Sequence, residues 1–112
     1  MVEDDPTSRE ALARILTRHK FAVETAETVR DALAQLDWPP DIILLDLILP
    51  DGLGVAVLQM VRNRGLHIKV VLLTGVEQPQ ELSEITESEP DAIFTKPLEV
   101  EQLIEWIRLN MN

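Results

Sequence analysis

The sequence predicts an α/β fold, a three-layer doubly wound five-stranded parallel sheet with strand order 2-1-3-4-5. Short runs of branched apolar residues alternate five times with longer stretches whose apolar residues recur at helical spacing. Strands that alternate with helices favour a parallel sheet covered on both faces, with right-handed crossovers. We expect one domain over residues 1–112, because a chain of this length can bury a sizeable core.

The first strand and helix are predicted from the start of the chain. Only two residues precede the acidic pair Glu3 and Asp4, whereas strands average about five or six residues. We therefore expect the first strand to be truncated at its start, with the natural chain beginning a few residues upstream. Asp5 and Pro6 then predict a helix start, because Asp is a good N-cap and Pro suits the first helical position.

The remaining elements follow from periodicity and from turn residues. The other predicted strands are 21–25, 42–46, 68–73 and 91–95, and the other predicted helices are 28–36, 54–64, 77–89 and 99–110. We expect Thr28 to cap the second helix and Gly65 to end the third. The helix over 77–89 has few large apolar residues, so we expect it to be among the least stable elements.

Composition and charge exclude several classes of function. The formal net charge of −10 argues against direct binding of nucleic acid or of an anionic membrane by this domain. The sequence contains no run of 18 apolar residues, so we expect no membrane span. The absence of cysteine excludes disulfides and thiolate metal sites and fits a cytoplasmic location, which we expect.

Reactive side chains follow four of the predicted strands. Glu3 and Asp4 follow the first strand, Asp46 ends the third, and Thr74 and Lys96 follow the last two. The carboxyl ends of parallel strands form the edge at which ligands bind in open α/β sheets. Three adjacent carboxylates cannot all remain ionised without compensation, and Mg²⁺ suits such a site and bridges to phosphate. A hydroxyl and an ammonium group beside it would form a cradle for phosphoryl oxygens.

Four segments in this order resemble the receiver domain of bacterial two-component response regulators. The segments are 2–6, 46–54, 71–75 and 94–97, each at the end of a predicted strand. The resemblance covers the chain apart from its short start and implies a flavodoxin-like topology. It also implies that Asp46 accepts a phosphoryl group from a phosphohistidine of a sensor histidine kinase or phosphotransfer protein.

The resemblance implies a role for each site residue. The groups that would hold Mg²⁺ are Asp4, Asp46, the backbone carbonyl of Ile48 and, through water, Glu3. Lys96 and Thr74 would each bind a phosphoryl oxygen, as expected when positioning and charge neutralisation drive phosphoryl transfer. The resemblance further implies a cis peptide bond between Lys96 and Pro97.

Three positions depart from the receiver pattern. Ile93 stands where receivers usually have an aromatic residue that moves with the switch hydroxyl, and the adjacent Phe94 should face the other side of the sheet. The positions that flank the phosphoryl group are the apolar Ile48 and Val76, which cannot orient an attacking water. We therefore expect a phosphoaspartate that hydrolyses slowly.

A surface for a partner is also predicted, and alternative functions remain. Trp106 and Leu109 lie off the apolar stripe of the last helix, which suggests a dimer or output-partner surface formed by the fourth helix, fifth strand and fifth helix. Alternatives are an unphosphorylated scaffold of the same fold, a small Mg²⁺-dependent phosphohydrolase, and a flavin carrier. A phosphohydrolase would need a base or a positioned water, and neither Ile48 nor Val76 offers one. A flavin carrier would need a loop after the first strand that binds phosphate, and this loop is too acidic.

Overall fold

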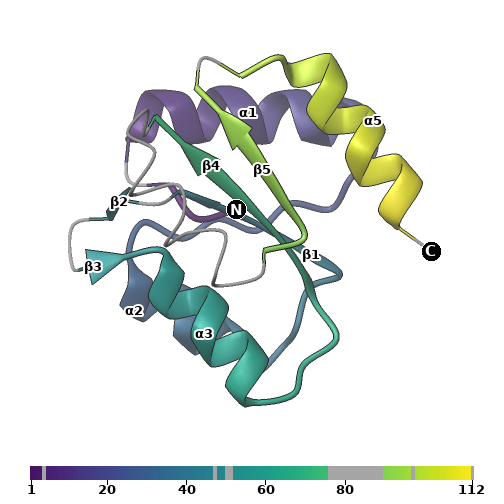
Figure 1. Cartoon of the computed structure of the whole chain (residues 1–112). Coiled ribbons are helices and arrows are strands. Elements are labelled where there is room, and N and C mark those ends of the chain that lie inside the picture. Colours follow the sequence, from purple (N-terminus) through teal and green to yellow (C-terminus); the bar gives the residue numbers. More distant parts are fainter. Residues whose placement is uncertain (4, 47, 50–51, 76–89, 97, 112) are drawn as a thin grey trace.

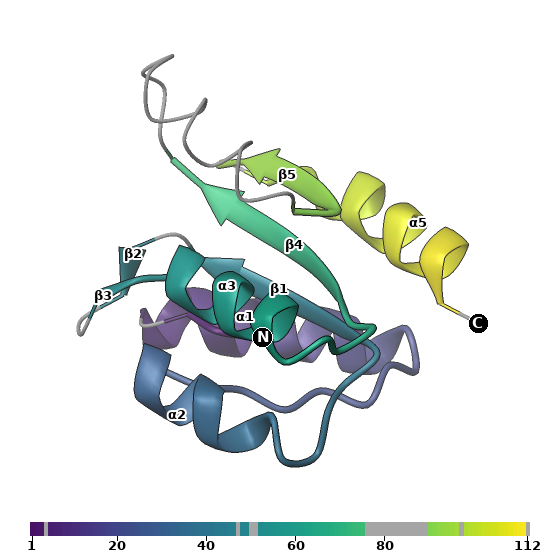
Figure 2. The same cartoon turned by 60° about the horizontal axis from the view of Figure 1, so that its bottom comes forward.

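The structure is a computed structural model that describes residues 1–3, 5–46, 48–49, 52–75, 90–96 and 98–111. It has three layers, with a parallel sheet between two pairs of helices (Figures 1 and 2). One face is covered by α1 (Pro6–Arg18) and α5 (Val100–Asn110), and the other by α2 (Val29–Gln35) and α3 (Val55–Asn63). This arrangement confirms the predicted α/β class. No helix in the described part of the chain is long and apolar enough to cross a membrane.

The sheet has the predicted strand order. Strands β1 (Ile42–Asp46), β4 (Lys69–Thr74) and β5 (Ala92–Thr95) form a parallel ladder in the order β1-β4-β5. On the free side of β1, Val2 forms parallel bridges to Leu45 and to Ala26. The sequence of segments across the sheet is therefore Ala26, Val2, β1, β4 and β5, which corresponds to 2-1-3-4-5. After β1 in the chain, β2 (Ile48–Leu49) pairs with β3 (Gly52–Leu53) in an antiparallel hairpin.

The second predicted strand is much shorter than expected. Residues 21–25 are not part of a ladder, and the single bridge on this side falls one residue later, at Ala26. The physical reason is the shortage of partner backbone, because only Met1 and Val2 lie between this segment and β1. The prediction of a strand over 21–25 was therefore wrong in its extent, although the segment occupies the predicted position.

Alternate residues of the strands pack into two separate cores. Residues of β1 and β4 that face α2 and α3 include Ile43, Leu45, Val70 and Leu72. Residues that face α1 and α5 include Leu44, Val71 and Leu73. Burial on both faces explains why these strands are continuous apolar runs. In β5, Ile93 packs against the first core and Phe94 against the second, so their predicted opposite orientations are confirmed.

The predicted helix boundaries match the cap geometry. The Asp5 carboxylate accepts a hydrogen bond from the Ser8 N–H at 3.1 Å, and the Thr28 hydroxyl accepts one from the Asp31 N–H at 3.0 Å. Gly65 follows α3 with a φ of 67°, a left-handed conformation that glycine adopts without strain. The predicted helix over 77–89 and the peptide bond between Lys96 and Pro97 lie outside the described residues.

Asp91 joins β4, α3 and the start of β5. Its Oδ2 accepts hydrogen bonds from the Val70 N–H at 2.7 Å and from the Arg62 guanidinium at 2.9 Å. We expect Asp91→Ala to lower the free energy of unfolding by roughly 1–3 kcal/mol, because it leaves the Val70 N–H without this acceptor. Asp91→Asn retains an acceptor for the Val70 N–H and should lower the free energy of unfolding by less. Urea titration measures both, with the exposed Asp37→Ala as control, and equal losses at positions 91 and 37 would contradict the assignment.

Candidate functional site

The site lies at the carboxyl edge of the sheet, where β1, β4 and β5 end. Asp46 is the last residue of β1 and Thr74 the last of β4, and both are buried. Thr74 pairs with Thr95 in the ladder, and the Lys96 N–H donates to the Thr74 carbonyl at 2.8 Å. The sheet register therefore fixes the backbone of all three predicted residues at one edge, as inferred from their places at strand ends.

One ammonium group joins two buried carboxylates. Lys96 Nζ lies 3.1 Å from Asp46 Oδ2 and 3.2 Å from Glu3 Oε2. Glu3 is 5% exposed and Asp46 is 8% exposed, so both acids are largely removed from water. The three side chains together carry a net charge of −1 when all are ionised, and a cation that entered would find oxygen ligands already gathered.

The environment shifts the pKa values of Glu3 and Lys96. Burial raises the pKa of Glu3 above its usual value of 4.5, and the Asp46 charge adds to this, although the Asp5 N–H and Lys96 partly oppose it. Burial alone would lower the pKa of Lys96, but its hydrogen bonds to Asp46 and Glu3 and their charges together raise it above 10.5. The lysine is therefore held protonated between the two acids.

The shift at Glu3 predicts a pH dependence of stability without metal. The folded state keeps this proton at a higher pH than the unfolded chain, whose pKa is near 4.5. Folded protein binds more protons in that window, so stability should fall as pH rises from about 4.5 through the raised pKa. Urea unfolding in metal-free buffer should show this component in the native protein and not in Glu3→Gln. Identical pH profiles for the two proteins would contradict it.

The predicted residues fall into three groups. Glu3, Asp46 and Lys96 are in direct contact, and Thr74 lies at the same edge beside them in the sheet. Ile48 begins β2 two residues after Asp46 and pairs with Leu53 in the β2-β3 hairpin. Asp4, Val76 and Pro97 lie outside the described residues.

Two residues outside the predicted set contact the backbone of Glu3 and Asp46. The Arg9 guanidinium donates to the Glu3 carbonyl at 3.1 Å and pairs with Glu27 at 3.1 Å, which ties α1 to the acidic segment. Gly54 packs against the Asp46 backbone so closely that a Cβ at this position would overlap the Asp46 carbonyl oxygen. Neither contact has a sequence signal, because each joins elements whose approach distance is set by packing.

The donor set fits a hard cation. Glu3 and Asp46 offer carboxylate oxygens at the end of the sheet, and Mg²⁺ prefers one or two carboxylates with water completing its shell. Among the described residues no group of three acidic or histidine side chains is close enough to hold a metal ion alone. A magnesium ion here would therefore depend on backbone oxygen, water or phosphate as well.

Comparison with known proteins decides the family. The family model described as "Response regulator receiver domain" matches residues 1–108. The chain belongs to the response regulator receiver family. Its receiver fold is similar to the receiver domain of a signal transduction histidine kinase from Syntrophus aciditrophicus, with 30% identity and a TM-score of 0.89, over 96% of this chain and 84% of that one.

Curated relatives of the receiver are transcriptional regulators by name. A putative transcriptional regulator of Haloferax volcanii is 36% identical over 94% of this chain and 18% of its own length. The phosphate regulon transcriptional regulatory protein PhoB of Escherichia coli is 32% identical over 99% of this chain and 50% of its own length. The receiver therefore spans half or less of these two relatives.

Proposed function

We propose that Asp46 is the phosphoacceptor of this receiver and that the donor is a phosphohistidine on a sensor histidine kinase or phosphotransfer protein. The observation that carries the proposal is the contact between the Asp46 carboxylate and the Lys96 ammonium at the carboxyl edge of the sheet. A carboxylate oxygen forms the new O–P bond while the P–N bond of the donor breaks, and the imidazole leaves. The product is an acyl phosphate with more negative charge than the original carboxylate.

The residues around Asp46 supply charge and orientation for this transfer. Lys96 Nζ already contacts Asp46 Oδ2, so it needs little movement to bind an oxygen of the incoming phosphoryl group. The Thr74 hydroxyl is the candidate for a second phosphoryl oxygen, because it ends the adjacent strand β4. Added charge at Asp46 would then compete with Glu3 for Lys96 and bias the receiver between two conformations.

Mg²⁺ fits this mechanism as an electrostatic cofactor. Glu3, Asp4, Asp46 and the Ile48 carbonyl are the groups that would hold it. When bound, the ion would neutralise developing charge on the phosphoryl oxygens, which is its usual part in phosphoryl transfer. The Lys96 contact with both Glu3 and Asp46 would hold the site together before the ion arrives.

A small-molecule phosphodonor tests the proposal without the kinase. We expect acetyl phosphate and Mg²⁺ to add one labile phosphoryl group per chain, detected by intact mass, and Asp46→Asn to lose it. The exposed Asp41→Asn should label as the native protein does. Unlabelled native protein, or a label that persists in Asp46→Asn, would favour the unphosphorylated scaffold or another acceptor.

The lifetime of the phosphoryl group is a separate prediction. Ile48 and Val76 flank the expected phosphoryl position by sequence, and neither side chain can hydrogen-bond an attacking water. We expect the label to persist for minutes or longer in Mg²⁺ without a phosphatase, followed by intact mass over time. Ile48→Asn should shorten the lifetime. Loss of the native label within seconds would contradict the prediction.

The end of α5 is the proposed output surface within the described residues. Leu109 is 74% exposed, whereas Trp106 is half-buried and packs against the core beneath α1 and α5. Leu109 is thus the better candidate for contact with an output domain or a second copy. The fourth helix of the predicted surface lies outside the described residues. The output of the whole protein is proposed to be transcriptional, in line with the names of its relatives.

A further inference from the structure

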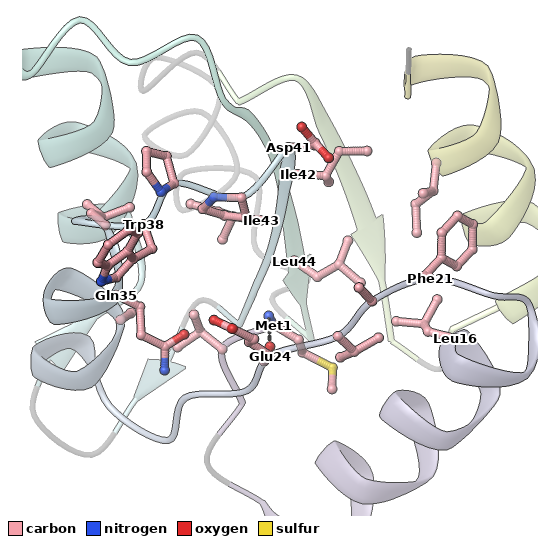
Figure 3. Close-up of a pocket in the computed structure, with 18 of the residues that line it drawn as sticks. Met1, Leu16, Phe21, Glu24, Gln35, Trp38, Asp41, Ile42, Ile43 and Leu44 are labelled. Atoms are coloured by element: carbon pink, nitrogen blue, oxygen red, sulfur yellow. Dashed lines mark hydrogen bonds between the residues drawn. The ribbon is translucent and has the colours of Figure 1, made fainter.

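Among the three side chains in contact at the site, Glu3 has the shortest stretch of strand behind it. The strands that carry the other two, β1 and β5, have five and four residues, whereas Val2 forms isolated bridges only. Backbone hydrogen bonds still hold this segment, because the Met1 amine donates to the Glu24 carbonyl at 2.8 Å (Figure 3) and the Glu3 N–H donates to the Ala26 carbonyl at 3.0 Å. These bonds leave the Glu3 carbonyl and carboxylate to be fixed by other contacts.

The start of α1 supplies two of those contacts. Arg9 Nη1 donates to the Glu3 carbonyl at 3.1 Å, and the Asp5 N–H donates to Glu3 Oε1 at 3.2 Å. The other carboxylate oxygen, Oε2, accepts from Lys96 at 3.2 Å. Three donors thus hold three different oxygens of Glu3. The carbonyl held by Arg9 belongs to the peptide bond between Glu3 and Asp4, the two predicted Mg²⁺-binding acids of this segment.

The surroundings of Arg9 fix the direction of its guanidinium. Its side chain is only 13% exposed, which is unusual for arginine. Nη2 lies 3.1 Å from Glu27 Oε1, on a side chain that is 62% exposed. An ion pair with so exposed a partner contributes little to stability. Two nitrogens of one planar group have separate acceptors, however, and a lysine ammonium could not reproduce that fork. The pair therefore orients Arg9 more than it stabilises the fold.

We propose that Arg9 is a positioning residue of the metal site, which fixes the Glu3 backbone and so keeps the Glu3 carboxylate in place for Mg²⁺, while Glu27 orients the guanidinium. This inference rests on the role of Mg²⁺ in the proposed function. A pure charge effect of Arg9 would have the opposite sign. A nearby cation repels Mg²⁺, so removal of the charge alone would strengthen Mg²⁺ binding, whereas loss of positioning weakens it.

The test measures the Mg²⁺ dissociation constant by isothermal titration calorimetry, without a phosphodonor, at a temperature where circular dichroism shows each variant folded. We expect Arg9→Met to weaken Mg²⁺ binding roughly 10-fold, as is typical when a residue that orients a metal ligand is lost. Arg9→Lys keeps the charge and should also weaken binding, and it carries the test if Arg9→Met does not fold. Glu27→Gln should have a smaller effect in the same direction. The exposed Arg14→Met and Glu24→Gln are matched controls and should bind as the native protein does.

Phosphorylation by acetyl phosphate provides a second readout. Arg9→Met should raise the Mg²⁺ concentration that gives half the maximal rate, by the same factor as the dissociation constant. The rate at saturating Mg²⁺ should stay close to native, because Asp46 and Lys96 are unchanged. In a Glu3→Gln background, Arg9→Met should have little further effect on Mg²⁺ binding, since Arg9 acts through Glu3.

Native or tighter Mg²⁺ binding in both Arg9 variants would overturn the proposal, as would an undiminished effect of Arg9→Met in the Glu3→Gln background. A native chain that binds no Mg²⁺ would overturn it together with the metal part of the proposed function. If Mg²⁺ affinity depends on Arg9 as expected but acetyl phosphate leaves Asp46 unlabelled, the positioning role stands and only the phosphoacceptor assignment fails.

Discussion

Lys96→Met is expected to destabilise the receiver by roughly 1–3 kcal/mol and to remove most of its phosphoryl transfer. The substitution leaves two buried carboxylates, Glu3 and Asp46, without the ammonium that lies 3.2 Å and 3.1 Å from them. The expected loss is below that of a fully buried pair, because the Lys96 side chain is 37% exposed. Methionine keeps the length and apolar stem of lysine, so the loss reports charge rather than packing.

The effect of Lys96 on stability should depend on the charge at Asp46. Asp46→Asn removes one of the two acids, so Lys96 then balances Glu3 alone, and we expect stability to remain within about 1 kcal/mol or to rise. In the Asp46→Asn background, Lys96→Met should lower the free energy of unfolding by less than it does in the native protein. Urea titrations of the four proteins form a double-mutant cycle. Equal losses in both backgrounds would show that Lys96 does not stabilise the fold through the charge of Asp46.

The rate at which Lys96→Met is phosphorylated tests the role of Lys96 in phosphoryl transfer separately from its role in stability. Loss of one group that stabilises developing charge typically lowers a rate by roughly 100-fold to 1,000-fold. We expect a loss of that order for Lys96→Met with acetyl phosphate, at a temperature where the variant is folded. Lys20→Met, at an exposed position after α1, is the matched control and should label normally. A native labelling rate in Lys96→Met would exclude Lys96 from the phosphoryl site.

The sequence predicted the elements whose burial pattern is local. The apolar runs of β1 and β4, the caps at Asp5 and Thr28, and the end of α3 at Gly65 depend on neighbouring residues, and the structure confirms them. The extent of strand 21–25 could not be predicted in the same way. Strand pairing there depends on the neighbouring first strand, which is itself expected to be short, and the residue pattern of 21–25 does not show this dependence.

The same distinction applies to the candidate site: its backbone placement could be predicted from the sequence, whereas its side-chain contacts could not. Placing Asp46 and Lys96 at one edge required only that their strands be parallel, and the register of β1, β4 and β5 provides this. That Lys96 bridges Glu3 as well as Asp46 depends on side-chain conformations, and the Arg9 contact with the Glu3 carbonyl depends on how α1 packs. These details are set by tertiary packing, which the local residue pattern does not contain.

Gly54→Ala is expected to have a larger effect on stability than Lys96→Met and a smaller one on phosphorylation, through the backbone of the phosphoacceptor. A Cβ at Gly54 would overlap the Asp46 carbonyl oxygen and lie 3.1 Å from a Leu45 side-chain carbon. Because the contact is with backbone between two buried elements, either the start of α3 or the Asp46 peptide must move. We expect a loss of roughly 2–4 kcal/mol in stability, typical of overpacking at a buried site.

Displacement of Asp46 should also slow its phosphorylation, by roughly 10-fold to 100-fold, since small misplacements of a reacting group are costly. Two other glycines provide controls, because a Cβ would meet nothing within 4 Å at Gly75 or Gly65. Gly75→Ala should change stability little, and Gly65→Ala should cost roughly 1 kcal/mol through its positive φ. Both should label at the native rate. If Gly54→Ala also labels at the native rate despite losing stability, then α3 yields rather than the Asp46 peptide, and Gly54 supports the fold without positioning the phosphoacceptor.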